Sequence, residues 1–375
     1  FFHKGNITAL NLHVALQHRK ANKPFYNMCK VRYLLIFTMA LGILTFSSCE
    51  NNPLKKVDVS ESKLEVKFSR LDRDIWAIDF QNPVAASQLL YQKYGSFYCD
   101  YMELILQAAP CRPDSNILAL EGFVNHPNMT DLQNRIQQKF PDSNLESFNA
   151  EFTEAIRRWN HYFPDSIAPE VVYMNSGLNF SAFSTDSVIS VGLDFFLGPN
   201  DSLVKLFPPD IFPQYFKDDM REDYLVVNAM KDFCWAQCNK QDHTTSKSDL
   251  LSIIVHQGKV MYMLDAMLPE AADSTKMNWS ASQMEWAQAN EVRVWKELAN
   301  QQVLFGTEHN KNKKWIDFAP FTRVEAIPQD SPPQLGIWMG WNMVRAYMKA
   351  NPDVTLHQLL AEKDAKKFLN VYKPK

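Results

Sequence analysis

The sequence predicts an α+β fold in which helices dominate and the β-sheet is small. Two observations carry this prediction. Apolar residues recur at helical spacing through much of the chain, and the stretch from Asp249 to Leu268 is apolar on nearly every face of a helix. Between residues 171 and 191 the period changes to two, as in short strands. No internal repeat, low-complexity tract or linker follows residue 60, so we expect a single domain over residues 61–375.

The first segment has the form of a bacterial secretion signal. Residue 1 is Phe, so we take Met28 as the natural start and expect residues 1–27 to be non-native. Residues 28–48 contain two cations, a short apolar run and then a pair of serines, which is the pattern of a signal peptide. The apolar run from Tyr33 to Phe46 is too short to cross a bilayer.

A cysteine directly follows the two serines, as in the lipobox at which bacterial lipoproteins are cleaved. We therefore predict that Cys49 is lipidated and becomes the new N-terminus, with the polar residues 49–60 as a tether. An ordinary signal peptide with an incidental cysteine is the alternative. Phe46 stands where leucine is commoner in a lipobox.

The first half of the domain is expected to be mostly helical. Lys63–Ile78 is the exception, because its apolar residues alternate as in a strand. The ranges with helical periodicity are Val84–Leu106, with a break at Gly95, Leu118–Asn125, Met129–Phe140 and Asn144–Phe163. The last of these ranges carries an apolar stripe made of Phe148, Phe152, Ile156 and Trp159.

Short strands follow these helices. We predict them at Val171–Met174, Asn179–Ser184 and Ser187–Val191, separated by Asn-Ser-Gly and Ser-Thr-Asp turns. Three prolines between residues 208 and 213 then predict an irregular crossing, and Arg221–Cys238 is helical again.

The helix predicted over Asp249–Leu268 belongs in the middle of the domain, because it is apolar nearly all round. Pro269 ends it. Three polar side chains, His256, Gln257 and Lys259, are set into this apolar frame. If the helix is buried, these groups need hydrogen-bonding or ionic partners.

A second helix is predicted to start at Ser280 or Ser282 and to run to Gln302. Its apolar stripe contains Met284, Ala287, Glu291, Val294, Trp295 and Leu298. A carboxylate in such a stripe either pairs with a buried cation or marks a site. We predict that Glu291 joins His256, Gln257 and Lys259 in a buried polar cluster, with Lys259 or His256 as its partner and a structural role.

Glycines and cysteines give two further expectations. Gly336 and Gly340 form a GxxxG pattern inside an amphipathic helix, which favours close packing against another helix. Cys99 and Cys111 flank a helical segment and could pair in an oxidising envelope, whereas Cys234 and Cys238 lie four residues apart in a helix, a poor geometry for a disulfide.

Several separated blocks resemble one known family in the same order. RLDRDIWAID, VISVGLDFFLGPN, HQGKVMYMLDAMLP, MEWAQANEVRVW, GIWMGWNMVRAYM and the final LNVYKPK are similar to GldB, the gliding-motility-associated lipoprotein family of Bacteroidetes. The likeness covers most of the mature chain. It implies a membrane-anchored envelope protein tied to gliding and its associated secretion machinery, although family members also occur in bacteria that do not glide.

The layout also resembles a zincin metalloprotease scaffold from which the chemistry has been lost. In zincins an HExxH helix holds Zn²⁺ with two histidines, and the glutamate is the general base. Here the corresponding residues read HQGKV, so His256 matches the first ligand and Glu291 could match a third ligand. Gln257 replaces the base and Val260 replaces the second histidine. We therefore expect no catalytic residue, no bound metal and no cofactor.

Charge argues against nucleic acid as a partner. Six of the 39 Lys and Arg residues precede Cys49 and no acidic residue does, so removal of the signal leaves 33 basic against 42 acidic residues, a net charge of −9. Such a chain would not dock electrostatically on nucleic acid or anionic lipid. A lipid anchor would hold it to the inner or outer membrane, facing the periplasm.

Two hypotheses of function follow from the sequence. The first is a non-catalytic envelope lipoprotein that contacts other proteins of a motility or secretion complex. The second is a metal-dependent hydrolase, a zincin-like peptidase with a non-standard site. Neither a GxSxG elbow, a Walker A loop nor a GxGxxG fingerprint is present to favour another enzyme class.

Overall fold

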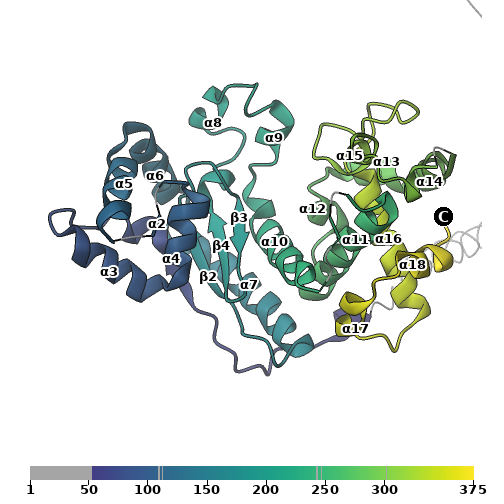
Figure 1. Ribbon diagram of the computed structural model, residues 1–375, viewed down its shortest axis with the longest axis horizontal. Coiled ribbons are helices and arrows are strands. Elements are labelled where there is room, and N and C mark those ends of the chain that lie inside the picture. Colours follow the sequence, from purple (N-terminus) through teal and green to yellow (C-terminus); the bar gives the residue numbers. More distant parts are fainter. Residues whose placement is uncertain (1–52, 109, 112, 242–243, 246, 301) are drawn as a thin grey trace, which may run out of the picture. The chain divides into compact units, whose positions relative to one another are not determined.

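The computed structural model describes residues 53–375 apart from residues 109, 112, 242–243, 246 and 301 (Figure 1). Pro53–Lys375 forms one compact unit. The predicted signal peptide, Cys49 and the start of the tether lie outside the described residues. The later part of the predicted tether overlaps the compact unit, because Leu54 and Val59 are buried in it. None of the described helices is both long and apolar enough to cross a membrane.

The sheet has four short strands in the order β1-β2-β4-β3. Their bounds are β1 (Phe68–Arg70), β2 (Glu170–Met174), β3 (Ala182–Ser184) and β4 (Val188–Gly192). β1, β2 and β4 run parallel to one another, whereas β3 pairs antiparallel with β4 and forms one edge of the sheet. Together with the many helices, this small mixed sheet confirms the predicted helix-dominated α+β class.

Alternation along β2 builds two apolar cores, one on each face of the sheet. Val171 and Tyr173 belong to the larger core, which also contains the apolar faces of the helices that follow the sheet. Val172 and Met174 point to the smaller core, which is formed with helices from the first half of the chain. The strand is therefore buried on both faces and reads as a continuous apolar run.

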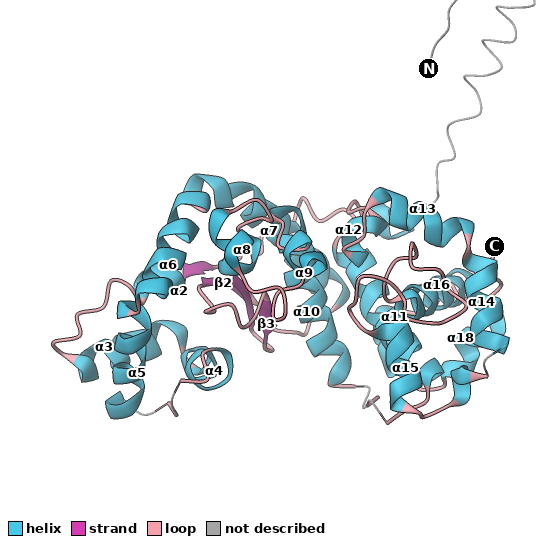
Figure 2. Cartoon of the chain, turned by 90° about the horizontal axis from the view of Figure 1, so that it is seen from above, coloured by secondary structure: helices cyan, strands magenta, loops and turns pink. Residues whose placement is uncertain are grey.

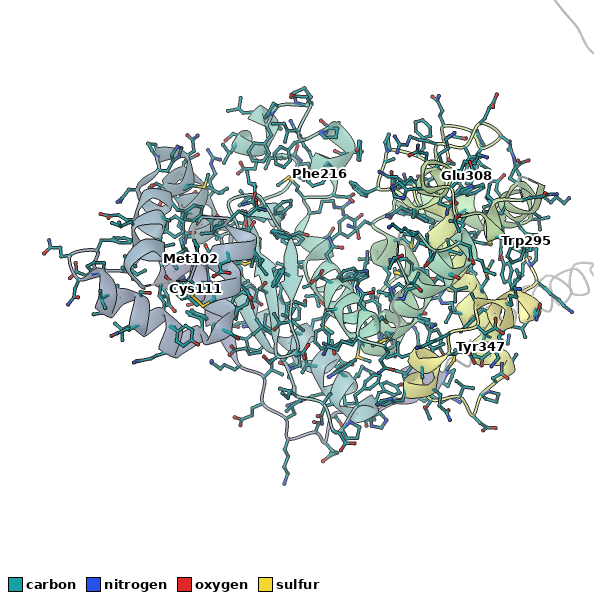
Figure 3. The ribbon with its side chains drawn as sticks, in the orientation of Figure 1. Met102, Cys111, Phe216, Trp295, Glu308 and Tyr347 are labelled. Atoms are coloured by element: carbon teal, nitrogen blue, oxygen red, sulfur yellow. A yellow bond between two sulfur atoms is a disulfide. The ribbon has the colours of Figure 1, made fainter. Side chains whose placement is uncertain are left out.

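Between β1 and β2, helices occupy most of the predicted places. They are α2 (Leu71–Asp74), α3 (Pro83–Tyr94), α4 (Ser96–Asp100), the π-helical η2 (Tyr101–Ile105), α5 (Pro113–Asn125), α6 (Pro127–Lys139) and α7 (Asp142–Tyr162), and the 3-10 helix η1 (Pro53–Lys56) comes before them. Gly95 separates α3 from α4 with a φ of +58°, which confirms the predicted break. Cys99 and Cys111 form a disulfide, beside the Cys111 label of Figure 3, whereas Cys234 and Cys238 are buried and are not part of a disulfide.

The second half of the unit is helical. In chain order its elements are η3 (Leu193–Phe196), α8 (Ser202–Leu206), α9 (Gln214–Asp218), η4 (Glu222–Tyr224), α10 (Leu225–Asn239), α11 (Leu250–Met267), α12 (Asp273–Met277), α13 (Ala281–Ala289), α14 (Glu291–Asn300), η5 (Val303–Phe305), α15 (His309–Ile316), α16 (Leu335–Ala350), α17 (Leu356–Ala361) and α18 (Ala365–Val371). α10 lies between the sheet and α11.

The central position predicted for the helix at Asp249–Leu268 is confirmed. Asp249 caps α11 by accepting a hydrogen bond from the Ser252 amide at 2.7 Å. Nearly every residue of α11 is buried, and α16 lies beside it with α14, α15 and α18 around the pair (Figure 2). The predicted close packing at the GxxxG pattern is also confirmed, since a Cβ on Gly340 would lie 1.9 Å from the Ile254 carbonyl oxygen.

Two predicted strands are shorter in the structure. The strand predicted over Lys63–Ile78 shrinks to β1, because the chain turns into α2 where the Asp72 carboxylate accepts hydrogen bonds from the Arg70 guanidinium at 2.8 and 2.7 Å. The strand predicted from Asn179 starts only at Ala182. The Ser176 hydroxyl accepts hydrogen bonds from the amides of Asn179 and Phe180, which holds both residues in a turn.

The second predicted helix is two helices, α13 and α14. Ser280 caps α13 in a capping box with Gln283, so its predicted start is confirmed. The helix ends at Ala289 because the Asn290 side chain donates to the Trp286 carbonyl at 2.9 Å and its backbone leaves the helical conformation. Glu291 therefore begins a new helix instead of continuing the stripe.

Candidate functional site

The three polar residues predicted on α11 lie in different surroundings. His256 and Lys259 are buried, whereas Gln257 is half-buried. The Lys259 ammonium donates to the main-chain carbonyl of Glu362, and it lies 5.8 Å from the centre of the Phe368 ring. The C-terminal segment of the chain therefore satisfies this buried cation.

Glu291 is buried and has a neutral partner. Its Oε1 accepts a hydrogen bond from the Tyr372 hydroxyl at 2.5 Å. Burial, with this hydrogen bond as a further cause, raises the pKa of Tyr372 above its usual range. The contact fixes the end of the chain against α14, as Lys259 does against α11.

An ion network that the sequence analysis missed lies further along α11, at Asp265. Asp265 accepts hydrogen bonds from Lys276 at 2.8 Å, from the Trp341 indole at 2.9 Å and from Arg345 at 2.8 Å. Arg345 also makes a bidentate pair with Asp273 and stacks 3.7 Å from the Trp341 ring centre. Two carboxylates thus balance two cations, and the network joins α11, α12 and α16.

A cleft lies between the edge strand β3 and the helices α10 and α11. It consists of two adjoining cavities of about 290 and 200 Å³, and both are lined by Ser181 and Asn228. The larger cavity is also lined by Ala182, Lys231, Asp232, Trp235, Gln257 and Val260. The smaller one is also lined by Phe195, Phe196, Phe216, Asp219, Met220, Asn278 and Phe318, and Figure 3 labels Phe216 at α9.

Titratable groups of the cleft have perturbed pKa values. Burial raises the pKa of Asp219 to about 6 and lowers the pKa of Lys231 to about 8. Asn278 links the two, because its amide nitrogen donates to Asp219 at 3.4 Å and its oxygen accepts from Lys231 at 3.3 Å. Burial also raises the pKa of Asp232. Perturbed groups gathered in a cleft are typical of functional sites.

The turn that leads into β3 is held by a fully buried carboxylate. Asp194 follows β4 and accepts hydrogen bonds from the Ser176 amide at 3.0 Å, the Ser176 hydroxyl at 2.7 Å and the Leu178 amide at 2.6 Å. Burial raises the pKa of Asp194 to about 6, and these hydrogen bonds oppose that rise. The position of the edge strand beside the cleft is fixed in this way.

The cleft has the chemistry of a recognition surface. It offers an ammonium group, carboxylates, amides and aromatic rings. Of the residues matched to a zincin site, Gln257 and Val260 line it; the Gln257 amide cannot act as a general base, and the Val260 side chain cannot bind a metal ion. Among the residues that the structure describes, no three His, Cys, Asp or Glu side chains are grouped so as to hold a metal ion.

Sequence reasoning found Gln257 but missed the α10 face of the cleft. Asn228, Lys231, Asp232 and Trp235 are spaced i, i+3, i+4 and i+7, so they share one side of the helix. That spacing was a readable signal in an otherwise apolar segment. Such a stripe is weak evidence for a site, however, because a polar stripe on a helix is usually only its solvated face.

A comparison with protein-family models finds the gliding motility protein GldB over residues 52–374. The match covers the whole compact unit except its last residue. No match was found among curated proteins or among solved structures.

Proposed function

Because the chain belongs to the family of the gliding motility protein GldB, we propose that it is a membrane-anchored envelope lipoprotein that serves the motility or secretion apparatus without catalysing a reaction. It acts through contacts with other envelope proteins. The observation that carries this proposal is the cleft beside β3, whose aromatic, amide and charged side chains suit recognition. The Cys99–Cys111 disulfide supports an oxidising compartment such as the periplasm.

The anchor is tested by substituting the predicted lipidation site. We expect the wild-type chain in the membrane fraction, and we expect Cys49→Ala to be released from it or left unprocessed, because the fatty acyl chains that would hold the protein are gone. Cell fractionation with an immunoblot for size and location measures both. Equal processing and equal membrane retention of the variant would contradict the anchor.

The contact role is tested with a photoreactive residue in place of Trp235, which lines the cleft and is 46% exposed. The substitution is made both in the wild-type chain and in the Cys49→Ala variant. Irradiated cells with the intact anchor should yield discrete adducts with envelope proteins. The matched control carries the photoreactive residue at Glu146, an exposed position on α7. The same adducts from both positions would show that the cleft is not the contact surface.

A further inference from the structure

The folded unit starts close to the predicted lipidation site. Only Glu50, Asn51 and Asn52 separate Cys49 from Pro53. An extended chain advances about 3.3–3.6 Å per residue, so the four steps from Cys49 to Pro53 span at most about 14 Å. The acyl chains of a lipidated cysteine are buried in the bilayer, which keeps the cysteine itself at the membrane surface. Lipidation of Cys49 would therefore hold Pro53 within about 14 Å of that surface.

The first residues of the unit do not lengthen this connection, because they belong to the fold. Leu54 is 8% exposed and lies in the larger core, and its carbonyl accepts a hydrogen bond from the Arg158 guanidinium at 3.3 Å. Lys55 pairs at 3.0 Å with Glu270, which follows the end of α11. η1 is thus a fixed part of the surface of the unit, and the connection to the lipid ends at Pro53.

This connection is short compared with the unit that it holds. A domain of this length has a radius of gyration of about 20 Å and is about 50 Å across. A connection of at most about 14 Å does not let such a unit turn its far side to the membrane. Figure 1 shows the purple start of the unit toward the bottom of the view and α8 and α9 at the top. Leu206 of α8 and Ile211, which are 80% and 66% exposed, lie in this far segment.

The surface at η1 suits lipid headgroups and not the hydrocarbon core of a bilayer. The exposed charged side chains of residues 53–61 are Lys55, Lys56, Asp58 and Glu61. Two cations and two carboxylates leave no net charge, so anionic lipid neither attracts nor repels this surface strongly. None of the large apolar side chains that are exposed in the described part of the chain belongs to residues 53–61. Because charged groups are costly in hydrocarbon, this surface rests at the headgroups without inserting.

We propose that the η1 end is the membrane-facing side of the unit, held against phospholipid headgroups by the short connection to Cys49. The α8–α9 segment, and with it the cavity lined by Phe216 of α9, lies on the side away from the bilayer. The inference rests on the proposed lipidation of Cys49 and deepens the proposed contact role. A partner protein reaches this cavity with its periplasmic part, and the exposed apolar residues of the α8–α9 segment are not a membrane anchor.

The test uses the full chain, purified with its lipid and inserted into preformed phosphatidylcholine vesicles whose headgroups carry a nitroxide quencher. A fluorescent amino acid replaces either Lys56, an exposed residue of η1, or Leu206 on α8 as the matched position. We expect at least threefold stronger quenching at position 56 than at position 206. Insertion of about twenty Gly and Ser residues after Asn51 should weaken the quenching at position 56, because the connection then has a mean length of about 25 Å and a much longer maximum reach.

Flotation of the vesicles separates failure of this inference from failure of the anchor. A chain that floats with the vesicles but is quenched equally at both positions, or more strongly at position 206, keeps the anchor and overturns the orientation. Quenching at position 56 that the insertion leaves unchanged would also contradict it, because the length of the connection would not then set the orientation. A chain that does not float loses both proposals, and Cys49→Ala gives the reference for that result.

Discussion

Glu291 illustrates how a buried charge can be held by a neutral group. The sequence analysis predicted a buried cation as its partner, and the structure provides the Tyr372 hydroxyl. Removing one member of a buried ion pair typically costs about 3–5 kcal/mol, because a charge is left uncompensated. A hydrogen bond to a charged group contributes less, about 1.5–3 kcal/mol.

We therefore expect Glu291→Ala to lower the free energy of unfolding by about 1.5–3 kcal/mol, and Glu291→Gln, which keeps an acceptor, to lower it less. Urea unfolding in a double-mutant cycle with Tyr372→Phe isolates the contact. Loss of function should follow reduced cellular abundance. An unshifted melting curve with function abolished would instead make Glu291 part of a functional site.

The raised pKa of Asp219 predicts that the stability of the folded chain depends on pH. Its pKa in the folded chain is about 6, against an ordinary value of 3.8, because of burial. The folded state thus binds this proton more tightly than the unfolded state. The stability that the protonated Asp219 contributes is therefore fully present below about pH 4 and is lost as the pH rises through 6. Asp219→Asn should stabilise the protein at pH 7, by up to about 3 kcal/mol, and have little effect at pH 4.

Urea unfolding at both pH values measures this difference. Asp210→Asn is the matched control, because Asp210 is exposed and its removal should change neither value. A variant of Asp219 that is less stable at pH 7 would show that the carboxylate is held by favourable contacts. If Asp219→Asn is instead more stable at pH 7, the chain retains in its cleft a carboxylate that lowers the free energy of unfolding, as functional sites often do.

At the scale of elements, α11 and α16 can cross closely only because glycines without a Cβ atom lie at the crossing. A Cβ on Gly340 would lie 1.9 Å from the Ile254 carbonyl oxygen, and one on Gly258 would lie 2.4 Å from the Gly340 carbonyl oxygen. Backbone atoms cannot move aside without separating the helices. Gly340→Ala should therefore lower the free energy of unfolding by about 3 kcal/mol or more.

Gly122→Ala is the matched control for this prediction. Gly122 also lies inside a helix, α5, but nothing lies within 4 Å of the position its Cβ would take. Alanine is the better helix former, so this variant should be more stable by about 0.5–1 kcal/mol. Thermal or urea unfolding of the two variants should give effects of opposite sign, and similar effects would contradict the close crossing.

The elements that sequence predicted well are those whose signal is local. The apolar frame of α11, the cap at Ser280 and the break at Gly95 each follow from a few neighbouring residues. The predicted bounds are wrong where a distant or competing hydrogen bond determines where a helix or strand begins or ends. Asn290 ends α13 through its own side chain, and Ser176 withdraws Asn179 from the predicted strand.

The candidate site was harder to predict than the fold, because it is assembled from segments far apart in the chain. Lys231 of α10 and Gln257 of α11 line the same cavity as Ser181, which precedes β3, only once these elements are packed. Lys231 looks like an ordinary surface lysine in the sequence, and its shifted pKa comes from tertiary burial. Spacing along one helix can indicate a face, but not what that face will meet.

For the whole molecule, the start of the folded unit is a testable boundary. Leu54 and Val59 are each 8% exposed, and the Leu54 carbonyl accepts a hydrogen bond from the buried Arg158 at 3.3 Å. The Lys55–Glu270 ion pair at 3.0 Å is exposed and should contribute little. The first residues after Pro53 therefore act as part of the core, in a segment that the sequence predicted to be tether.

A chain that begins at Ser62 should be less stable than one that begins at Pro53, because it loses two buried apolar side chains worth about 1.5–3 kcal/mol each. Leu54→Ala in the longer chain should reproduce about half of the loss, whereas Lys55→Ala, which removes only the exposed ion pair, should change little. Urea unfolding midpoints of the four proteins measure this. Equal midpoints for the two chain starts would mean that the tether extends to residue 60 and that the contacts of Leu54 and Val59 contribute no stability.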